Sequence, residues 1–295
     1  MKKFISTALA AVTLMATLVS CGNNGGANTE TSGNDASAAI TGEITVITRE
    51  EGSGTRDAFV ELLEITDADG NDAIYDGAEI TEKTSVMLTS VAGNKKAIGY
   101  VSLGSLSDDV KAIKVNGVEA TADNVKSGEY TVSRNFNLAY KEDSLSDVAA
   151  DFLKFVLSVE GQAIIEEEGY IAVDATEHYT ASGVSGKFTL AGSTSVGPVA
   201  EVLCEAYKEL NPDVQFDVQQ TGSSAGMTSA SEGACDIGMA SRDLKDSEKE
   251  VLTGVKIATD GIAVVVNLEN SVESLTSEQI ANIFKGELTD WSEIG

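Results

Sequence analysis

Residues 49–56, REEGSGTR, decide how this chain is organised. Residues 43–48 before them (EITVIT) alternate apolar and polar side chains, as a half-buried strand does, and apolar residues recur at helical spacing over positions 58–63. A helix start carries unpaired backbone N–H groups and partial positive charge. A strand that enters a helix through Gly, Ser and Thr, flanked by arginines, is therefore typical of a site for a tetrahedral oxyanion. The candidate ligands are Arg49, Ser53, Gly54 and Thr55.

Taken alone, this loop also fits a plain capped helix with surface arginines. Two further junctions of the same kind favour the anion site. Residues 187–191 read as a strand that opens GSTSVGP at 192–198, and residues 214–218 run into TGSSAG at 221–226. Ligands of parallel α/β sheets lie at the carboxyl ends of strands. The three loops are therefore expected to converge on one anion from two sides.

Strands and helices alternate along the chain, which predicts an α/β fold with mainly parallel sheets. We expect an extended crossing at 132–140, a long amphipathic helix from Ser144 that is interrupted at Gly161, and separate buried strands at 255–258 and 262–267.

Composition limits the function. The chain has 295 residues, enough for two ordinary domains, and a formal net charge of −27. Nucleic-acid binding needs a basic face, so we expect no nucleic-acid partner. A small anionic ligand is still allowed, because local donors define its site.

The N-terminus has the pattern of an export signal. A basic MKK start precedes an apolar run at 4–19 that is too short for a good membrane span, and LVSC at 18–21 resembles a bacterial lipobox. We expect a signal peptide at 1–20, lipidation of Cys21, and a flexible Gly/Asn/Ser/Thr-rich tether at 21–41. The alternative is a plain secretory signal with an incidental cysteine.

Nothing in the sequence indicates a metal, a cofactor or an enzyme. Cys204 and Cys235 have no metal-ligand spacing, although a disulfide between them is left open. The single histidine, His178, lies in a polar loop and is expected to be a solvated surface residue. No nucleotide-binding P-loop occurs.

Seven stretches together resemble the substrate-binding lipoprotein of bacterial phosphate ABC importers, the PstS family, which has the two-lobe fold of type II periplasmic binding proteins. The stretches span nearly the whole mature chain. They are residues 49–56, 97–104 (AIGYVSLG), 191–198 (AGSTSVGP), 221–226, 236–245 (DIGMASRDLK), 260–267 (DGIAVVVN), and 283–286 (IFKG) with 289–291 (TDW).

Their order departs from the family, in which the segment like 187–295 precedes the segment like 43–179. The resemblance therefore implies a circular permutant, opened at a surface loop. The rival is a rearranged gene cut short, whose two half-domains could not close a site. As a permutant the chain would form a continuous lobe A at 133–262 and a lobe B from 42–132 and 263–295, with the ligand cleft between the lobes.

The resemblance also implies the ligand contacts. Lobe A would supply Thr194, Ser195, Ser223, Ser241 and Arg242, and lobe B would supply the loop at 49–56. Some members carry an aspartate at about the position of Arg242, where it accepts a proton from the ligand. Glu51 would either orient Arg49 or accept that proton, which would discriminate against sulfate.

The implied function is non-enzymatic capture of inorganic phosphate outside the cytoplasm by a monomer that is lipid-anchored to the bacterial cell membrane. The partners would be ABC permease subunits encoded by separate chains. The alternatives are another oxyanion (sulfate, molybdate or tungstate) and a lipid-anchored phosphate sensor or scaffold without a transport role.

Overall fold

The computed structural model describes residues 39–294. The signal peptide, Cys21 and the tether up to residue 38 lie outside this range. Within residues 39–294, no helix has both the length and the apolar character needed to cross a bilayer.

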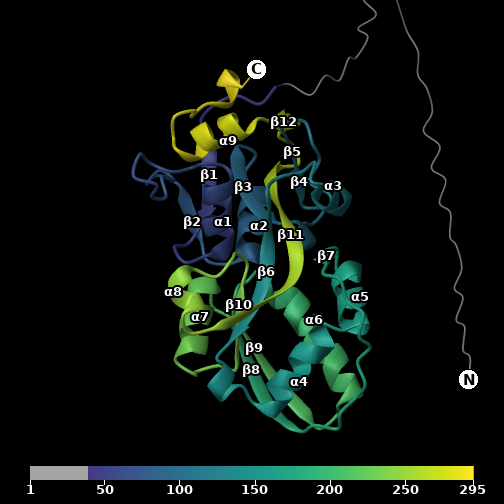
Figure 1. Ribbon diagram of the computed structural model, residues 1–295. Coiled ribbons are helices and arrows are strands. Elements are labelled where there is room, and N and C mark those ends of the chain that lie inside the picture. Colours follow the sequence, from purple (N-terminus) through teal and green to yellow (C-terminus); the bar gives the residue numbers. More distant parts are fainter. Residues whose placement is uncertain (1–38, 295) are drawn as a thin grey trace, which may run out of the picture. The chain divides into compact units, whose positions relative to one another are not determined.

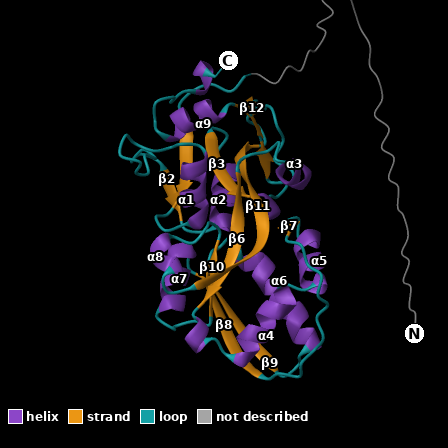
Figure 2. Ribbon diagram, in the orientation of Figure 1, coloured by secondary structure: helices purple, strands orange, loops and turns teal. Residues whose placement is uncertain are grey.

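One continuous mixed sheet forms the framework (Figure 2). Eight strands form its main path, in the spatial order β2 (Glu79–Thr81), β1 (Thr45–Arg49), β3 (Ala97–Ser102), β11 (Thr253–Asn267), β6 (Ser133–Tyr140), β10 (Ile237–Ala240), β8 (Gly186–Gly192) and β9 (Val214–Gln220). Two short strands, β4 (Val110–Ala112) and β7 (Ile171–Ala172), also pair with β11. Strand β5 (Lys114–Val115) pairs with β12 (Ser274–Leu275) in a separate two-stranded sheet.

The long strand β11 links the two halves of the sheet. Its first part runs antiparallel to β6, from Thr253 opposite Tyr140 to Gly261 opposite Ser133. Its last part, from Ile262, runs antiparallel to β3. Figure 1 shows β11 and β6 passing side by side between the upper and lower groups of helices. One strand therefore replaces the two that the sequence predicted.

Two large apolar cores lie on either side of this crossing. Buried side chains of the first core come from residues 44–132 and 262–291, and those of the second come from residues 136–258. We call the part built around the first core lobe B and the part around the second core lobe A. The folded unit is therefore a two-lobe α/β structure.

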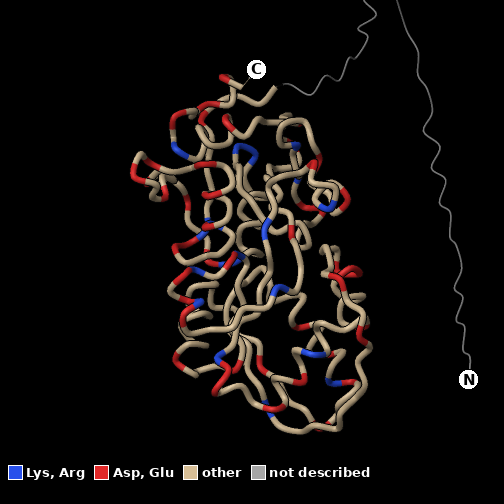
Figure 3. Tube along the Cα trace, in the orientation of Figure 1, with Lys and Arg blue, Asp and Glu red and all other residues tan. Residues whose placement is uncertain are grey.

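Helices cover the sheet in each lobe, and acidic residues occur throughout both (Figure 3). Those of lobe B are α1 (Gly54–Leu62), α2 (Thr84–Gly93), α3 (Ala122–Ser127) and α9 (Ser277–Phe284), with 3-10 turns at Leu103–Ser105 and Trp291–Glu293. Those of lobe A are α4 (Asp147–Val156), α5 (Val159–Glu167), α6 (Gly197–Leu210), α7 (Ser223–Ser231) and α8 (Asp246–Lys249), with a 3-10 turn at Glu142–Ser144.

The first and last described segments pack against each other. The Ile44 N–H donates to the Thr289 carbonyl at 2.8 Å, and the Trp291 N–H donates to the Gly42 carbonyl at 3.0 Å. The Asp290 side chain accepts from the Gly42 N–H at 3.0 Å. Residues 42 and 290 thus meet on one edge of lobe B.

The disulfide left open between Cys204 and Cys235 does not form in this structure. Cys204 and Cys235 are buried and free, and burial raises the pKa of both thiols above its ordinary value. His178 is exposed, as expected, with Nδ1 2.8 Å from a Glu160 carboxylate oxygen.

Candidate functional site

Six hydroxyl side chains meet between the two lobes, and we call them the hydroxyl cluster. All six are buried. Thr55 Oγ1 of lobe B lies 2.9 Å from Ser195 Oγ of lobe A, and Thr84 Oγ1 lies 3.3 Å from Thr194 Oγ1. The members are Thr55, Thr84, Thr194, Ser195, Ser223 and Ser241.

The cluster lies at the starts of helices α1, α2, α6 and α7. Thr55 and Thr84 belong to the first turns of α1 and α2, and Ser223 opens α7. Ser195 lies two residues before α6, where its N–H donates to Ser193 Oγ at 3.2 Å. Four helix N-termini therefore direct partial positive charge and backbone donors to one place.

Arg49 adds a full positive charge to this place. It is the last residue of β1 and is only 2% exposed. Its Nε and Nη2 donate to the two Glu50 carboxylate oxygens, each at 2.9 Å, and Nη2 also donates to Thr194 Oγ1 of lobe A at 3.0 Å. Among the described residues, Nη1 bonds only to Thr84 Oγ1, at 3.4 Å. Nη1 therefore keeps an N–H for a ligand.

Comparison with known proteins identifies the family of this chain. A family model described as a PBP superfamily domain matches residues 11–160 and 177–295. The phosphate-binding protein PstS 2 of Streptococcus agalactiae is 47% identical over 268 residues, which cover 88% of this chain and 91% of that protein. PstS 2 of Streptococcus pneumoniae is 43% identical over 281 residues, 94% of each chain. The crystal structure of a phosphate-binding protein of a phosphate ABC transporter from S. pneumoniae TIGR4 has a TM-score of 0.70 at 44% identity, covering 86% of this chain and all of that one.

The chain belongs to the PstS family of periplasmic binding proteins. Its two-lobe α/β fold is the fold that the sequence predicted.

Most residues expected as ligands in this PstS-family site lie together. Ser53 caps α1, and its Oγ accepts from the Arg56 N–H at 3.4 Å. Because the hydroxyl accepts in this bond, its own proton is free to be donated to an anion. The expected residues that lie together between the lobes are Arg49, Ser53, Gly54, Thr55, Thr194, Ser195, Ser223 and Ser241.

Arg242 was expected among the ligands, but its guanidinium is engaged elsewhere. Its five N–H groups have five protein partners, which leaves no donor for a ligand. Burial opposes the charge of Arg242, but the carboxylates of Glu248 and Asp57 together outweigh burial and raise the pKa of Arg242. The partners are Asp57, the Asp243 carbonyl, Ser224 and both oxygens of Glu248.

Glu51 was expected to orient Arg49 or to accept a ligand proton. Glu50 holds Arg49 instead, in a two-point ion pair, and Glu51 is exposed. The reason is geometric. Glu50 directly follows strand β1, and its N–H bonds to the Thr81 carbonyl of β2, whereas Glu51 lies in the turn beyond. The orienting role therefore belongs to Glu50.

Thr84 was not among the residues expected from the sequence. It lies at the start of α2, after the short strand β2, in a region without a Gly/Ser/Thr loop. Strand β2 runs parallel to β1, with Thr81 opposite Arg49, so both strands deliver their carboxyl ends to the site. The one available signal was the strand-to-helix change near residues 79–84.

In this PstS-family structure, the approach of the lobes requires glycine at position 54. A Cβ there would overlap the Ser223 hydroxyl and lie 2.8 Å from Ser241 Oγ, both of lobe A. Gly54→Ala is therefore expected to weaken anion binding by roughly tenfold or more, since even small misplacements of binding groups are costly. Calorimetric titration with phosphate measures the loss.

Gly93→Ala is the matched control, because Gly93 ends α2 and its Cβ would meet nothing within 4 Å. The two variants should unfold at similar temperatures, because the Gly54 clash lies between the lobes and not inside either core. Equal phosphate affinity of the two variants would contradict the close approach at Gly54.

Within residues 39–294, no group of three or more His, Cys, Asp or Glu side chains is placed to hold a metal ion. The site instead offers hydroxyls, helix starts and one arginine. This donor set suits an anion.

Proposed function

We propose that this chain is an extracytoplasmic receptor that captures inorganic phosphate between its two lobes and delivers it to an ABC importer. The observation that carries the proposal is the hydroxyl cluster, where Thr55 and Ser195 of opposite lobes lie 2.9 Å apart beside the buried Arg49. The family membership supports the same ligand, since the relatives carry the name phosphate-binding protein.

Physical chemistry explains why such a site suits phosphate. Removing a dianion from water is costly unless each oxygen meets a donor. Hydroxyls can also accept a hydrogen bond, so the cluster can pair with a protonated phosphate oxygen as well as with an ionised one. Donors from both lobes would close on the ligand by a hinge motion at β6 and β11.

The proposed ligand contacts are the hydroxyl cluster, Arg49, Ser53 and the backbone at Gly54. Glu50, and not Glu51, is the carboxylate that bonds to Arg49.

The chain would bind phosphate without transforming it and would act as a monomer. Lipidation at Cys21 would hold it on the outer side of the cell membrane, where it would dock on separate permease subunits.

Calorimetric titration of the chain from residue 21 onward, with Cys21 replaced by Ser, tests the ligand. We expect one phosphate per chain, with sulfate as the comparison anion. Equal binding of both anions would favour a general oxyanion carrier. A folded protein that binds neither would contradict the receptor and favour a scaffold.

We also propose that the chain is a circular permutant, with lobe A at 133–262 and lobe B at 42–132 and 263–295. The contacts between residues 42–44 and 289–291 support this, because a short link there would restore the usual family order without moving either segment. Each alignment with a streptococcal PstS 2 covers about nine-tenths of both chains, which supports the same order of segments in this chain and in those two relatives.

A reordered chain tests the permutation. It would start at residue 186, run to 294, and continue through a short linker into residues 42–184. We expect the reordered chain to bind phosphate within about threefold of the original, because the site's contacts do not depend on where a surface loop is opened. A reordered chain that is folded but fails to bind would contradict the permutation.

A further inference from the structure

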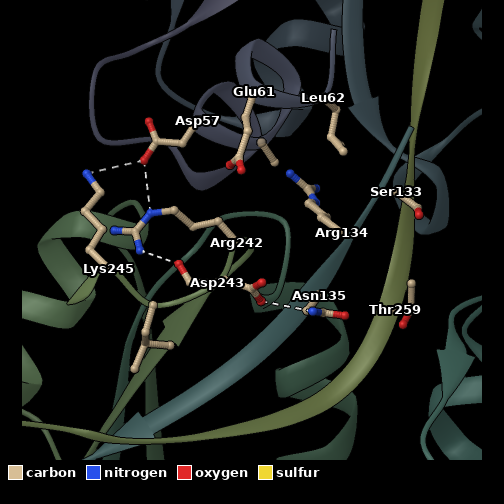
Figure 4. A pocket seen from close by; sticks show the side chains of 12 residues that line it. Asp57, Glu61, Leu62, Ser133, Arg134, Asn135, Arg242, Asp243, Lys245 and Thr259 are labelled. Carbon is tan, nitrogen blue, oxygen red and sulfur yellow. Dashed lines mark hydrogen bonds and ion pairs between the residues drawn. The ribbon is translucent and has the colours of Figure 1, made fainter. Parts of the chain in front are cut away.

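Arg242 connects the two lobes through an ion pair. It follows strand β10 in lobe A, and its Nε donates to Asp57 Oδ2 on helix α1 of lobe B at 3.0 Å. Figure 4 shows the two side chains facing each other at the end of the pocket that they line, with Lys245 Nζ 3.7 Å from the same carboxylate.

Within lobe A, Glu248 fixes the position of Arg242. The two Glu248 carboxylate oxygens each accept from one terminal nitrogen of the guanidinium at 2.8 Å. Arg242 is 6% exposed and Glu248 is 15% exposed, so this pair is well shielded from water. Glu248 belongs to α8 of the same lobe, so a hinge motion would leave the pair intact. Arg242 therefore presents a preorganised N–H to the other lobe.

Asp57 lies in the first turn of α1, two residues after Thr55 of the proposed anion loop of Ser53, Gly54 and Thr55. A second contact between the lobes lies nearby, where the Ser224 N–H donates to the Gly52 carbonyl at 3.0 Å. Because α1 moves as one body, bringing its N-terminus onto an anion also brings Asp57 onto Arg242. Opening the lobes would separate Asp57 from Arg242.

An interaction that exists in only one of two conformations shifts their equilibrium by its own free energy. The Asp57–Arg242 bond is charge-assisted, which makes it stronger than a neutral hydrogen bond. Asp57 is 30% exposed and borders a pocket of 460 Å³, so salt should reach and weaken the bond.

We propose that Asp57 and Arg242 form a latch that sets the lifetime of the closed, ligand-bound state. Arg242 is then a positioning residue that acts on the ligand through lobe closure and does not touch it. The latch rests on the proposed phosphate function and adds to it a residue pair that controls release.

Stopped-flow kinetics of phosphate binding by Asp57→Asn test the latch in the complete folded chain. We expect the dissociation rate to rise by about tenfold, since a charge-assisted hydrogen bond of the closed state is weakened. The association rate should stay within about twofold, since the latch forms after the ligand enters the open cleft. Raising the salt concentration should speed release from the original protein more than from the variant.

Glu61→Gln is the matched control. Glu61 lies one turn further along α1, lines the same pocket and is exposed, so the variant loses the same charge without losing the contact to Arg242. Its dissociation rate should equal that of the original. Asp57→Glu should restore much of the slow release, and unfolding temperatures without phosphate should show that all variants are folded.

An unchanged dissociation rate in folded Asp57→Asn would overturn the latch, as would an equal acceleration in Glu61→Gln. A slower association with unchanged release would also overturn it. These outcomes are distinct from a failure of the proposed function, which would appear as absent phosphate binding by the original protein.

Discussion

Arg49→Gln is expected to weaken phosphate binding by roughly a thousandfold, about 4 kcal/mol, because a buried charge-assisted donor is lost and its carboxylate partner is left unpaired. Arg49 is 2% exposed and bonds to residues of both lobes. In the variant, the Glu50 carboxylate would lose both hydrogen bonds from the guanidinium and would repel the incoming anion. Calorimetric titration measures the change in Kd.

The double variant Arg49→Gln/Glu50→Gln separates the two causes. If repulsion by unpaired Glu50 contributes, the double variant should bind phosphate more tightly than Arg49→Gln and less tightly than the original. Glu51→Gln is the matched control, because Glu51 is exposed and Glu50 is the residue that pairs with Arg49. An Arg49→Gln protein that binds within about tenfold of the original would contradict the assignment of Arg49 as a ligand.

Asp260→Asn is expected to destabilise the fold by about 3–5 kcal/mol, because it leaves the charge of Arg134 buried without a partner. Asp260 and Arg134 lie opposite each other on β11 and β6, where the chain crosses between the lobes. Their side chains are 1% and 2% exposed, and Arg134 Nη2 donates to Asp260 Oδ2 at 3.0 Å. Burial raises the pKa of Asp260 and lowers the pKa of Arg134, because it disfavours the charged form of each. Urea unfolding measures the loss.

The double variant Arg134→Met/Asp260→Leu is the control for this pair. Arg134 Nε and Nη1 and Asp260 Oδ1 have no hydrogen-bond partner among the described residues, so the pair is incompletely satisfied. Replacing both residues by apolar ones is therefore expected to cost much less than Asp260→Asn alone. An Asp260→Asn protein within about 1 kcal/mol of the original would show that the pair does not hold the crossing together.

The three Gly/Ser/Thr loops at strand-to-helix junctions could be predicted from sequence because their chemistry is local. A strand followed by a few small hydroxyl residues and a helix start places Thr55, Ser195 and Ser223 at the N-terminal ends of helices. Thr84 could not be found in this way, because its place depends on the pairing of β2 with β1.

The sequence does not show which neighbours in space a charged side chain will contact. Arg242 was placed by resemblance alone, but Glu248 and Asp57 occupy its donors. Glu50 and Glu51 are adjacent acids, and only the end of strand β1 distinguishes their directions.

The helix expected from Ser144 shows the same limit on a smaller scale. The break falls at Ser158, whose hydroxyl caps α5 by accepting from the Gly161 N–H at 3.2 Å. Gly161 marks a close approach to the Phe155 carbonyl and does not itself interrupt the helix. A glycine read from sequence alone does not reveal which of these roles it has.

A crystal structure of the chain grown with phosphate would locate the ligand. We expect one tetrahedral anion between the lobes, with its oxygens on the hydroxyl cluster, the α1 and α7 starts and Arg49 Nη1, and with Arg242 still on Asp57 and Glu248. An anion held by Arg242 or Glu51, or a closed cleft without an anion at saturating phosphate, would contradict it.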